Sequence, residues 1–240
     1  MENGKFLWDI FYPPRCAICD CILGRNETYV CTGCASLPKR ILKDFCLKCG
    51  RPVGEEQAVC PQCKGRSFSF DAGRSAFIYD RYMRRSIKNF KYHGRQEYAL
   101  YYADVLFEMY REDVEKTGAD AILPVPVHRE RFRKRGYNQA ELLAEEFGRK
   151  MELPVYGNLL VRTKKTAPQK ELSDKERLKN LCQAFSVNMK VWELSKGINC
   201  VIIIDDIYTT GSTIEACSRA LRAFGIKKIF FLCVCTGQGD

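Results

Sequence analysis

The sequence predicts an α/β protein with a mainly parallel sheet, preceded by a small cysteine-rich domain. Two observations lead to this prediction. Strand-like and helix-like segments alternate after about residue 70, which is typical of a parallel sheet with helices on both faces. Nine of the 14 cysteines lie before residue 64, most of them in Cys-x-x-Cys pairs. We therefore expect two domains, residues 1–68 and residues 69–240.

Four strands and three helices are expected in the second domain from the spacing of apolar residues. The strands are expected at residues 75–79, 121–127, 200–204 and 228–235. The helices are expected at residues 87–110, from Asn138 onward and at 212–224. Asn138 can cap its helix, with Glu141 three residues later as in a capping box. Residues 162–180 are polar and basic, so we expect a long mobile loop there.

The overall composition is that of a folded protein. Hydrophobic residues make up 46% of the 240 residues and charged residues 28%. No apolar run reaches the length of about 18 residues that a membrane span requires, so none is expected. The apolar run at residues 6–12 is too short for a signal sequence, and a cytoplasmic location is the default expectation.

Four Cys-x-x-Cys pairs form the pattern of the first domain. Tight turns of this kind let two thiolates approach one metal ion, and two turns complete a tetrahedral site. The pattern predicts two structural zinc ions, each held by four thiolates. The predicted metal ligands are Cys16, Cys19, Cys31, Cys34, Cys46, Cys49, Cys60 and Cys63.

Several alternatives remain open for these cysteines. Disulfides suit a secreted chain, iron–sulfur clusters use differently spaced ligands, and redox pairs normally occur singly. Pairing of the first turn with the second and the third with the fourth is simplest, but a cross-braced arrangement would also satisfy the spacing. Cys21 is left over, and we interpret it as a bystander.

The most informative segment is residues 201–213, where four apolar residues precede two carboxylates and a turn rich in hydroxyl groups. In parallel sheets, ligands bind at the carboxyl ends of the strands. Backbone N–H groups at the following helix start can hold a phosphate, and Gly211 permits close approach. Carboxylates would repel that phosphate, so they are expected to bind sugar hydroxyls. The predicted ribose 5-phosphate site is Asp205, Asp206, Thr209, Thr210, Gly211, Ser212 and Thr213.

A simpler interpretation of the same segment is a capped helix with two exposed aspartates. The sequence contains no Gly-x-x-x-x-Gly-Lys-Ser/Thr loop and no Gly-x-Gly-x-x-Gly after a strand, so the two common nucleotide-binding loops are not expected.

The acid pair and the Thr-Thr-Gly-Ser-Thr turn resemble the motif of type I phosphoribosyltransferases that binds 5-phosphoribosyl-1-pyrophosphate (PRPP). The whole chain resembles the competence protein F family more closely. The segments that carry this resemblance are the cysteine pairs, residues 124–128, residues 135–140, and Arg162, Pro168, Gln169, Arg177, Asn180 and Phe185.

The resemblance implies a type I phosphoribosyltransferase fold that binds PRPP with Mg²⁺, and a role in the uptake of single-stranded DNA. Any chemistry would be displacement at the anomeric carbon of the ribose. No catalytic residue is assigned, although Asp205 and Asp206 are candidates, and no acceptor is implied. By analogy with the fold, the expected pyrophosphate-binding residues are Lys91, His128, Arg129, Arg135 and Arg162.

The net charge of +10 favours a polyanionic partner or serves solubility alone. Residues 81–95, 129–135 and 162–170 are basic, and they contain more cations than one PRPP molecule requires. Aromatic residues among cations also suit single-stranded DNA, whose bases stack on such rings. Two further hypotheses follow: a DNA-binding factor in which PRPP is a regulator or has no role, and a zinc-ribbon adaptor with a vestigial site. A solvent-exposed helix face at residues 81–95 is the simpler alternative.

Overall fold

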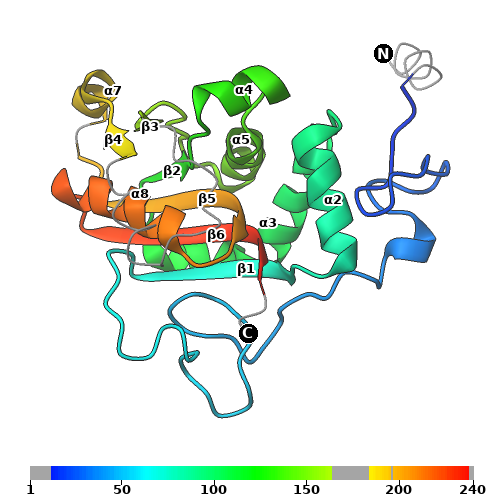
Figure 1. Cartoon of the computed structure of the whole chain (residues 1–240), viewed down its shortest axis with the longest axis horizontal. Coiled ribbons are helices and arrows are strands. Elements are labelled where there is room, and N and C mark those ends of the chain that lie inside the picture. Colours follow the sequence, from blue (N-terminus) through cyan, green and yellow to red (C-terminus); the bar gives the residue numbers. More distant parts are fainter. Residues whose placement is uncertain (1–11, 164–183, 196, 238–240) are drawn as a thin grey trace.

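The computed structural model describes residues 12–163, 184–195 and 197–237. Its main sheet has four parallel strands in the order β1-β6-β5-β2 (Figure 1). The strands are β1 (Ala72–Ile78), β2 (Ala121–Pro124), β5 (Cys200–Tyr208) and β6 (Lys228–Thr236). The predicted fold class is confirmed, because the sheet is parallel and follows a cysteine-rich region. The predicted domain boundary at residue 68 stays a prediction.

Both faces of the sheet are covered, and β5 shows how. Ile202 and Ile204 pack in one buried cluster with residues of three helices, whereas Val201 and Ile203 pack in a second buried cluster on the other face. Alternate residues of a strand point to opposite faces, so a continuous apolar run is suited to a strand that is buried on both.

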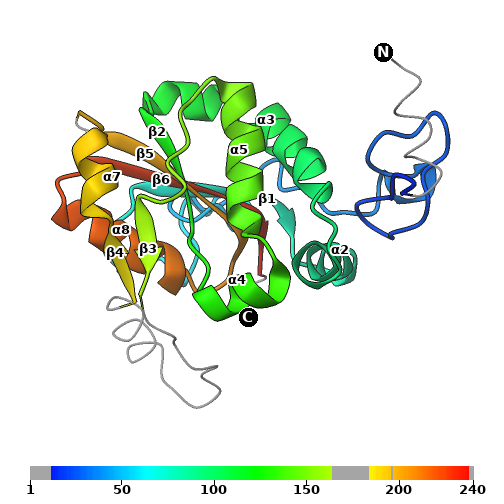
Figure 2. The same cartoon turned by 90° about the horizontal axis from the view of Figure 1, so that it is seen from above.

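Three helices cover the first face: α2 (Arg81–Tyr92), α3 (Tyr98–Thr117) and α5 (Gln139–Met151). Helix α8 (Ser212–Ala223) covers the second face (Figure 2). The expected single helical stretch at residues 87–110 is interrupted, because α2 ends at Tyr92 and Gly94 adopts a positive φ of 70°. Asn138 caps α5 as expected, accepting a hydrogen bond from the Ala140 N–H.

Two short helices and a strand pair complete the second half. Helix α4 (Arg129–Arg135) follows β2, and α7 (Met189–Leu194) precedes β5. Strands β3 (Leu160–Arg162) and β4 (Phe185–Val187) form a separate antiparallel pair. Most of the expected loop at residues 162–180 lies outside the described residues, which end at Thr163 and resume at residue 184.

Residues 12–70 contain little regular structure apart from the 3-10 helix η1 (Thr32–Cys34). They form two cysteine-bearing lobes in different places: the first lobe contains the cysteines from Cys16 to Cys34, and the second contains those from Cys46 to Cys63. The first lobe lies beside α2 and α3, where the Tyr98 hydroxyl donates to the Cys16 carbonyl over 2.9 Å (Figure 1). The second lobe lies beside β1, and its four cysteines belong to the same buried cluster as α8. Each lobe therefore packs on the apolar core rather than standing apart from it.

One expectation about β5 needs correction. The strand was expected to end at Ile204, with the acid pair after it, but it continues to Tyr208 and pairs with β6 over its full length. The two aspartates are therefore held by a paired strand, which fixes their backbone more rigidly than a loop would. Among the described residues, no helix combines the length and apolar character needed to cross a membrane.

Candidate functional site

The acid pair and the hydroxyl-rich turn line one cavity of about 270 Å³. Asp205 and Asp206 come from the carboxyl end of β5, and Thr209 and Thr213 come from the turn between β5 and α8. Thr210, Gly211 and Ser212 of the same turn do not line this cavity, and Thr210 lines a smaller one beside Cys63. The structure thus brings together the two groups of residues that were predicted to bind a sugar and its phosphate.

Asp206 is almost fully buried and forms an ion pair with Lys91 of α2, with 2.8 Å between Oδ2 and Nζ. Burial alone would lower the pKa of Lys91, but the charges of Asp206 and Asp205 raise it above its ordinary value. Removing one partner from a buried ion pair typically costs about 3–5 kcal/mol. Lys91 was expected to contact pyrophosphate, and in this structure it neutralises a carboxylate instead.

Asp205 has a different electrostatic environment from its neighbour. Burial raises its pKa to about 7, and the nearby charge of Asp206 acts in the same direction, whereas Lys91 opposes the shift. Its Oδ1 accepts the Asp206 N–H over 2.8 Å. Of the two adjacent carboxyl groups, the one without a direct cation partner therefore tends to keep its proton near neutral pH, where it can donate to a ligand hydroxyl.

The turn after β5 has the geometry of an anion site. Gly211 adopts a φ of 79° at the start of α8, and a Cβ at this position would meet the Tyr208 hydroxyl. Gly211, the N-cap residue of α8, has no side chain that could cap this helix end, and the Thr210 hydroxyl accepts the Ser212 N–H only over a long 3.5 Å. Its N–H groups therefore face the turn, together with the partly exposed hydroxyls of Ser212 and Thr213. The Thr210 and Ser212 hydroxyls lie 2.8 Å apart.

The expected pyrophosphate residues are divided between two adjoining cavities. Arg135 and Arg162 line the cavity of the acid pair, whereas His128 and Arg129 line a neighbouring one of about 840 Å³, to which Arg162 also contributes. His128 acts as the N-cap of α4, its side chain accepting the Glu130 N–H. Burial and the charge of Arg131 lower the pKa of Arg162, which is consistent with a crowded cationic site.

Arg131 is a site residue that the sequence analysis did not single out, although it lies in a basic stretch. It lines the acid-pair cavity with Arg135, four residues later on α4. Residues four apart lie on the same side of a helix, so the spacing was an available signal once α4 was assumed to be helical. Asn138 and Gln139 also line the cavity; they lie in the segment 135–140 that carries the family resemblance, but they were not predicted as site residues.

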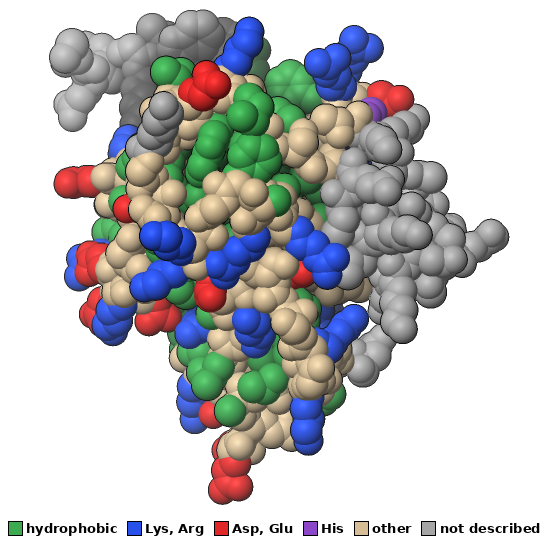
Figure 3. Space-filling view, turned by 90° about the vertical axis from the view of Figure 1, so that its left-hand side faces the viewer, with side chains coloured by type: hydrophobic (Ala, Val, Ile, Leu, Met, Phe, Trp, Pro, Cys, Tyr) green, Lys and Arg blue, Asp and Glu red, His purple; other side chains and the backbone are tan. Residues whose placement is uncertain are grey.

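Basic residues are exposed over α4, which has no buried residue. Phe132 on this helix is 46% exposed, and Tyr92 of α2, 57% exposed, lies beneath the Arg135 guanidinium at 4.8 Å. Figure 3 views the side of the molecule that carries α7 and α8, where Lys and Arg are interspersed with Asp and Glu. The surface therefore combines mixed charge on that side with a cationic and aromatic segment on α4.

The second cysteine lobe contains a complete four-sulfur site. The sulfurs of Cys46, Cys49, Cys60 and Cys63 lie within 4.8 Å of one another, and all four residues are buried. The Gly50 N–H donates to the Cys46 carbonyl over 2.8 Å, closing the tight turn of this knuckle. Four converging thiols without another acidic ligand fit a structural zinc ion, and the third pair joins the fourth as the simplest pairing predicted.

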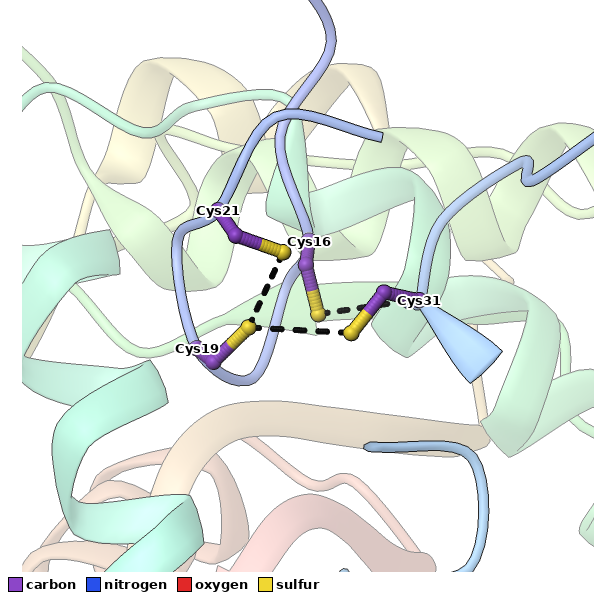
Figure 4. Close-up of side chains that lie close together, drawn as sticks. All are labelled: Cys16, Cys19, Cys21 and Cys31. Carbon is purple, nitrogen blue, oxygen red and sulfur yellow. Dashed lines mark hydrogen bonds between the residues drawn. The ribbon is translucent and has the colours of Figure 1, made fainter. Parts of the chain in front are cut away.

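The first cysteine lobe differs from the prediction in one ligand. The sulfurs of Cys16, Cys19, Cys21 and Cys31 lie within 4.8 Å of one another, and Figure 4 shows them directed toward a common centre. Cys21, expected to be a bystander, lies 3.2 Å from Cys19 through their sulfurs. Cys34 is not part of this group, although burial and the neighbouring Cys19 and Cys31 thiols raise its pKa. The four grouped thiols fit one tetrahedral zinc ion, with Cys21 in the place predicted for Cys34.

We expect the purified chain to carry two zinc ions and the Cys63→Ser variant to carry one, because only the second site loses a thiolate. Metal content is measured by native mass spectrometry. Cys200→Ser is the control, since Cys200 is buried at the far end of β5 and belongs to neither group. A zinc content of two in Cys63→Ser, or of one in the control, would contradict this assignment.

The raised pKa of Asp205 gives a second prediction. A folded-state pKa of about 7 lies above the ordinary carboxyl value of about 3.9, so neutral Asp205 stabilises the fold at low pH. This stabilisation is lost as the pH rises from about 4 through about 7. Asp205→Asn keeps the oxygen that accepts the Asp206 N–H and does not ionise. Its unfolding free energy relative to wild type should therefore increase over this range, by a few kcal/mol.

Denaturant unfolding at several pH values measures this difference. Glu193→Gln serves as the control, because that carboxylate is exposed on α7. A stability difference between Asp205→Asn and wild type that stays constant with pH would show that Asp205 titrates normally.

Comparisons with known proteins agree with the two cysteine groups and with the α/β part of the chain. The model of a family described as a double zinc ribbon domain matches residues 7–64. Competence protein F of Haemophilus influenzae is 31% identical, covering 91% of this chain and 95% of that protein. Competence protein ComFC of Bacillus subtilis is 28% identical over 88% of this chain and 89% of its own length. DNA utilization protein YhgH of Escherichia coli (strain K12) is 27% identical over 93% and 97%.

These similarities extend beyond the cysteine lobes and include the sheet and the cavity at its edge. An identity of 31% over nine-tenths of both chains is more than a shared zinc ribbon would produce. The chain therefore belongs to the competence protein F family.

Proposed function

We propose that this protein binds PRPP, as its Mg²⁺ complex, in the cavity at the carboxyl end of β5. The observation that carries the proposal is that Asp205, Asp206, Thr209 and Thr213 line one cavity with three arginines. Carboxylates suit the ribose hydroxyls, and the N-terminus of α8 suits the 5′-phosphate. The three arginines, Arg131, Arg135 and Arg162, suit the pyrophosphate.

A ligand that binds here would compete with Lys91 for the carboxylate of Asp206. The ribose hydroxyls would contact Asp206 at the place where the Lys91 ammonium now lies, 2.8 Å away. A bound pyrophosphate would offer Lys91 a second anion and so free Asp206 for the sugar. Mg²⁺ would be held mainly by pyrophosphate and sugar oxygens, because such ions keep few protein ligands.

If the bound PRPP reacts, the reaction is displacement of pyrophosphate at the anomeric carbon. The chain would contribute by holding the sugar and by stabilising the departing pyrophosphate with Arg131, Arg135 and Arg162. Neither aspartate needs to act as a base for this step, since their role is to hold the ribose. The protein would then be a phosphoribosyltransferase.

Calorimetric titration with PRPP and Mg²⁺ tests the proposal. We expect the Asp205→Ala/Asp206→Ala variant to bind at least about tenfold more weakly than wild type, because the hydrogen bonds of both side chains to the ribose are lost. Glu193→Ala, which removes an exposed carboxylate of α7, should bind as wild type does. Equal affinity in wild type and the double variant, or no binding by wild type, would refute PRPP binding at this site.

A second candidate function is the handling of single-stranded DNA during DNA uptake, together with proteins of that process. The relatives named for competence and DNA utilization favour it, as do the exposed cations of α4 beside Phe132 and Tyr92. Exposed rings among cations can stack bases while the cations contact phosphates. PRPP would then be a regulator or have no role.

We propose a cytoplasmic location, because the reduced thiols that hold zinc are typical of that compartment.

The dependence of DNA affinity on salt concentration tests this second function. We expect the affinity for single-stranded DNA to fall as salt rises, because each neutralised phosphate releases a counterion. Arg131→Gln/Arg133→Gln should reduce the slope by about one to two ions. Lys64→Gln, an exposed lysine of the second cysteine lobe, is the control and should leave the slope unchanged. A salt-independent affinity, or equal slopes in all three proteins, would exclude a phosphate-binding surface on α4.

A further inference from the structure

The second cysteine lobe is in direct contact with the sheet that carries the proposed PRPP site. Gly50, with a φ of 73°, lies so close to β1 that a Cβ would be 2.6 Å from the Arg74 Cα. The Gly73 N–H donates to the Lys48 carbonyl over 3.0 Å. Lys48 Nζ also donates to the Phe70 and Asp71 carbonyls over 2.6 Å and 2.9 Å. The lobe and the sheet are therefore packed backbone to backbone at this point.

Arg51 extends this contact to the end of β5. It follows Cys49 by two residues, and its carbonyl accepts the Cys46 N–H over 2.7 Å, so the knuckle fixes its backbone. The residue is 8% exposed, and its guanidinium lies 5.3 Å from the centre of the Tyr208 ring. Its Nε is buried and has no hydrogen-bond partner among the residues that the structure describes. A buried cation of this kind needs compensation, which a four-thiolate zinc centre of net charge about −2 and the ring face both offer.

Tyr208 lies between Arg51 and the phosphate-binding turn and contacts both. Its ring is 3% exposed and stacks on Phe231 with 4.8 Å between ring centres. The hydroxyl lies where a Cβ of Gly211 would be, directly beneath the turn. Arg51, Tyr208 and Thr210 also line one small cavity of about 90 Å³ beside Cys63. Arg51 and Tyr208 thus form an unbroken series of contacts from the second zinc centre to Gly211.

A separate contact holds the helix that begins at this turn. Glu215, in the first turn of α8, is 4% exposed. One of its carboxylate oxygens accepts the Ser69 N–H over 2.8 Å, and the other accepts the Ser69 hydroxyl over 2.9 Å. Ser69 follows Cys63 by six residues, so the segment leaving the lobe is bonded to α8. The lobe therefore supports both sides of the turn: Tyr208 before it and α8 after it.

We propose that Arg51 and Tyr208 are positioning residues through which the second zinc ribbon holds the 5′-phosphate-binding turn in its binding conformation. This inference rests on the PRPP site proposed above and adds a role for the ribbon. Neither side chain needs to touch the ligand. They act by keeping the N–H groups at the start of α8 aligned before binding, so less ordering is required when the phosphate arrives.

The test compares two ligands that occupy different parts of the proposed site. Ribose 5-phosphate requires the turn, whereas pyrophosphate with Mg²⁺ requires the arginines Arg131, Arg135 and Arg162. Arg51→Met keeps the length of the side chain and removes its charge. We expect calorimetry to show binding of ribose 5-phosphate weakened about tenfold and binding of pyrophosphate unchanged, with two zinc ions retained. Arg51→Lys should restore part of the lost affinity.

Lys64→Met is the matched control, because Lys64 is an exposed cation beside Cys63, and it should bind both ligands as wild type does. Wild-type affinity of Arg51→Met for ribose 5-phosphate would overturn the inference while leaving PRPP binding standing. An equal loss for both ligands would also overturn it, since that pattern indicates general distortion. If wild type binds neither ligand, the proposed function fails, and this inference fails with it.

Discussion

Strand β5 is buried on both faces, and this burial determines where the two carboxylates lie. Its residues from Val201 to Ile204 alternate between a buried cluster with three helices on one face and a buried cluster with α8 and the second cysteine lobe on the other. Each fully buried isoleucine contributes about 1.5–3 kcal/mol, so the strand cannot shift its register without exposing apolar surface. Asp205 and Asp206 are therefore delivered to the sheet edge by the core itself, and their positions depend on packing rather than on contacts at the site.

The cost of placing two acids at the end of a buried strand is reduced by unequal environments. Asp206 has Lys91 as a partner, while burial raises the pKa of Asp205 to about 7. A neutral acid beside an ionised one avoids the repulsion that two adjacent carboxylates would suffer. It also gives the site one hydrogen-bond donor and one acceptor, a combination suited to neighbouring hydroxyl groups. The unequal protonation that reduces repulsion between Asp205 and Asp206 is thus also what suits this end of β5 to a sugar.

The two cysteine lobes lie against different walls of this site. The first lobe packs on α2 and α3, where Arg95 pairs with Asp20 over 2.7 Å, and α2 also carries Lys91. The second lobe packs on β1 and α8 and reaches the turn through Arg51. A structural zinc centre fixes a short segment that has too little apolar surface to fold alone. Each lobe is therefore held together by its own zinc centre rather than by an apolar core of its own.

The sequence by itself determined the features that depend on local spacing. The parallel α/β class, the cap at Asn138, the second four-cysteine group and the association of the acid pair with the Thr209–Thr213 turn all follow from residues close together in the chain. Periodicity and ligand spacing are properties of short segments, so one sequence is enough to recognise them.

Only the tertiary structure decided which distant residues meet. It placed Lys91 on Asp206, Cys21 inside the first cysteine group, and Arg51 over the ring of Tyr208. It also interrupted the helix expected at residues 87–110 and extended β5 as far as Tyr208. Contacts between Lys91 and Asp206 join positions more than a hundred residues apart, and they exist because the core brings α2 and β5 together. No local pattern encodes such a pairing, since its energy comes from burial that the whole chain provides.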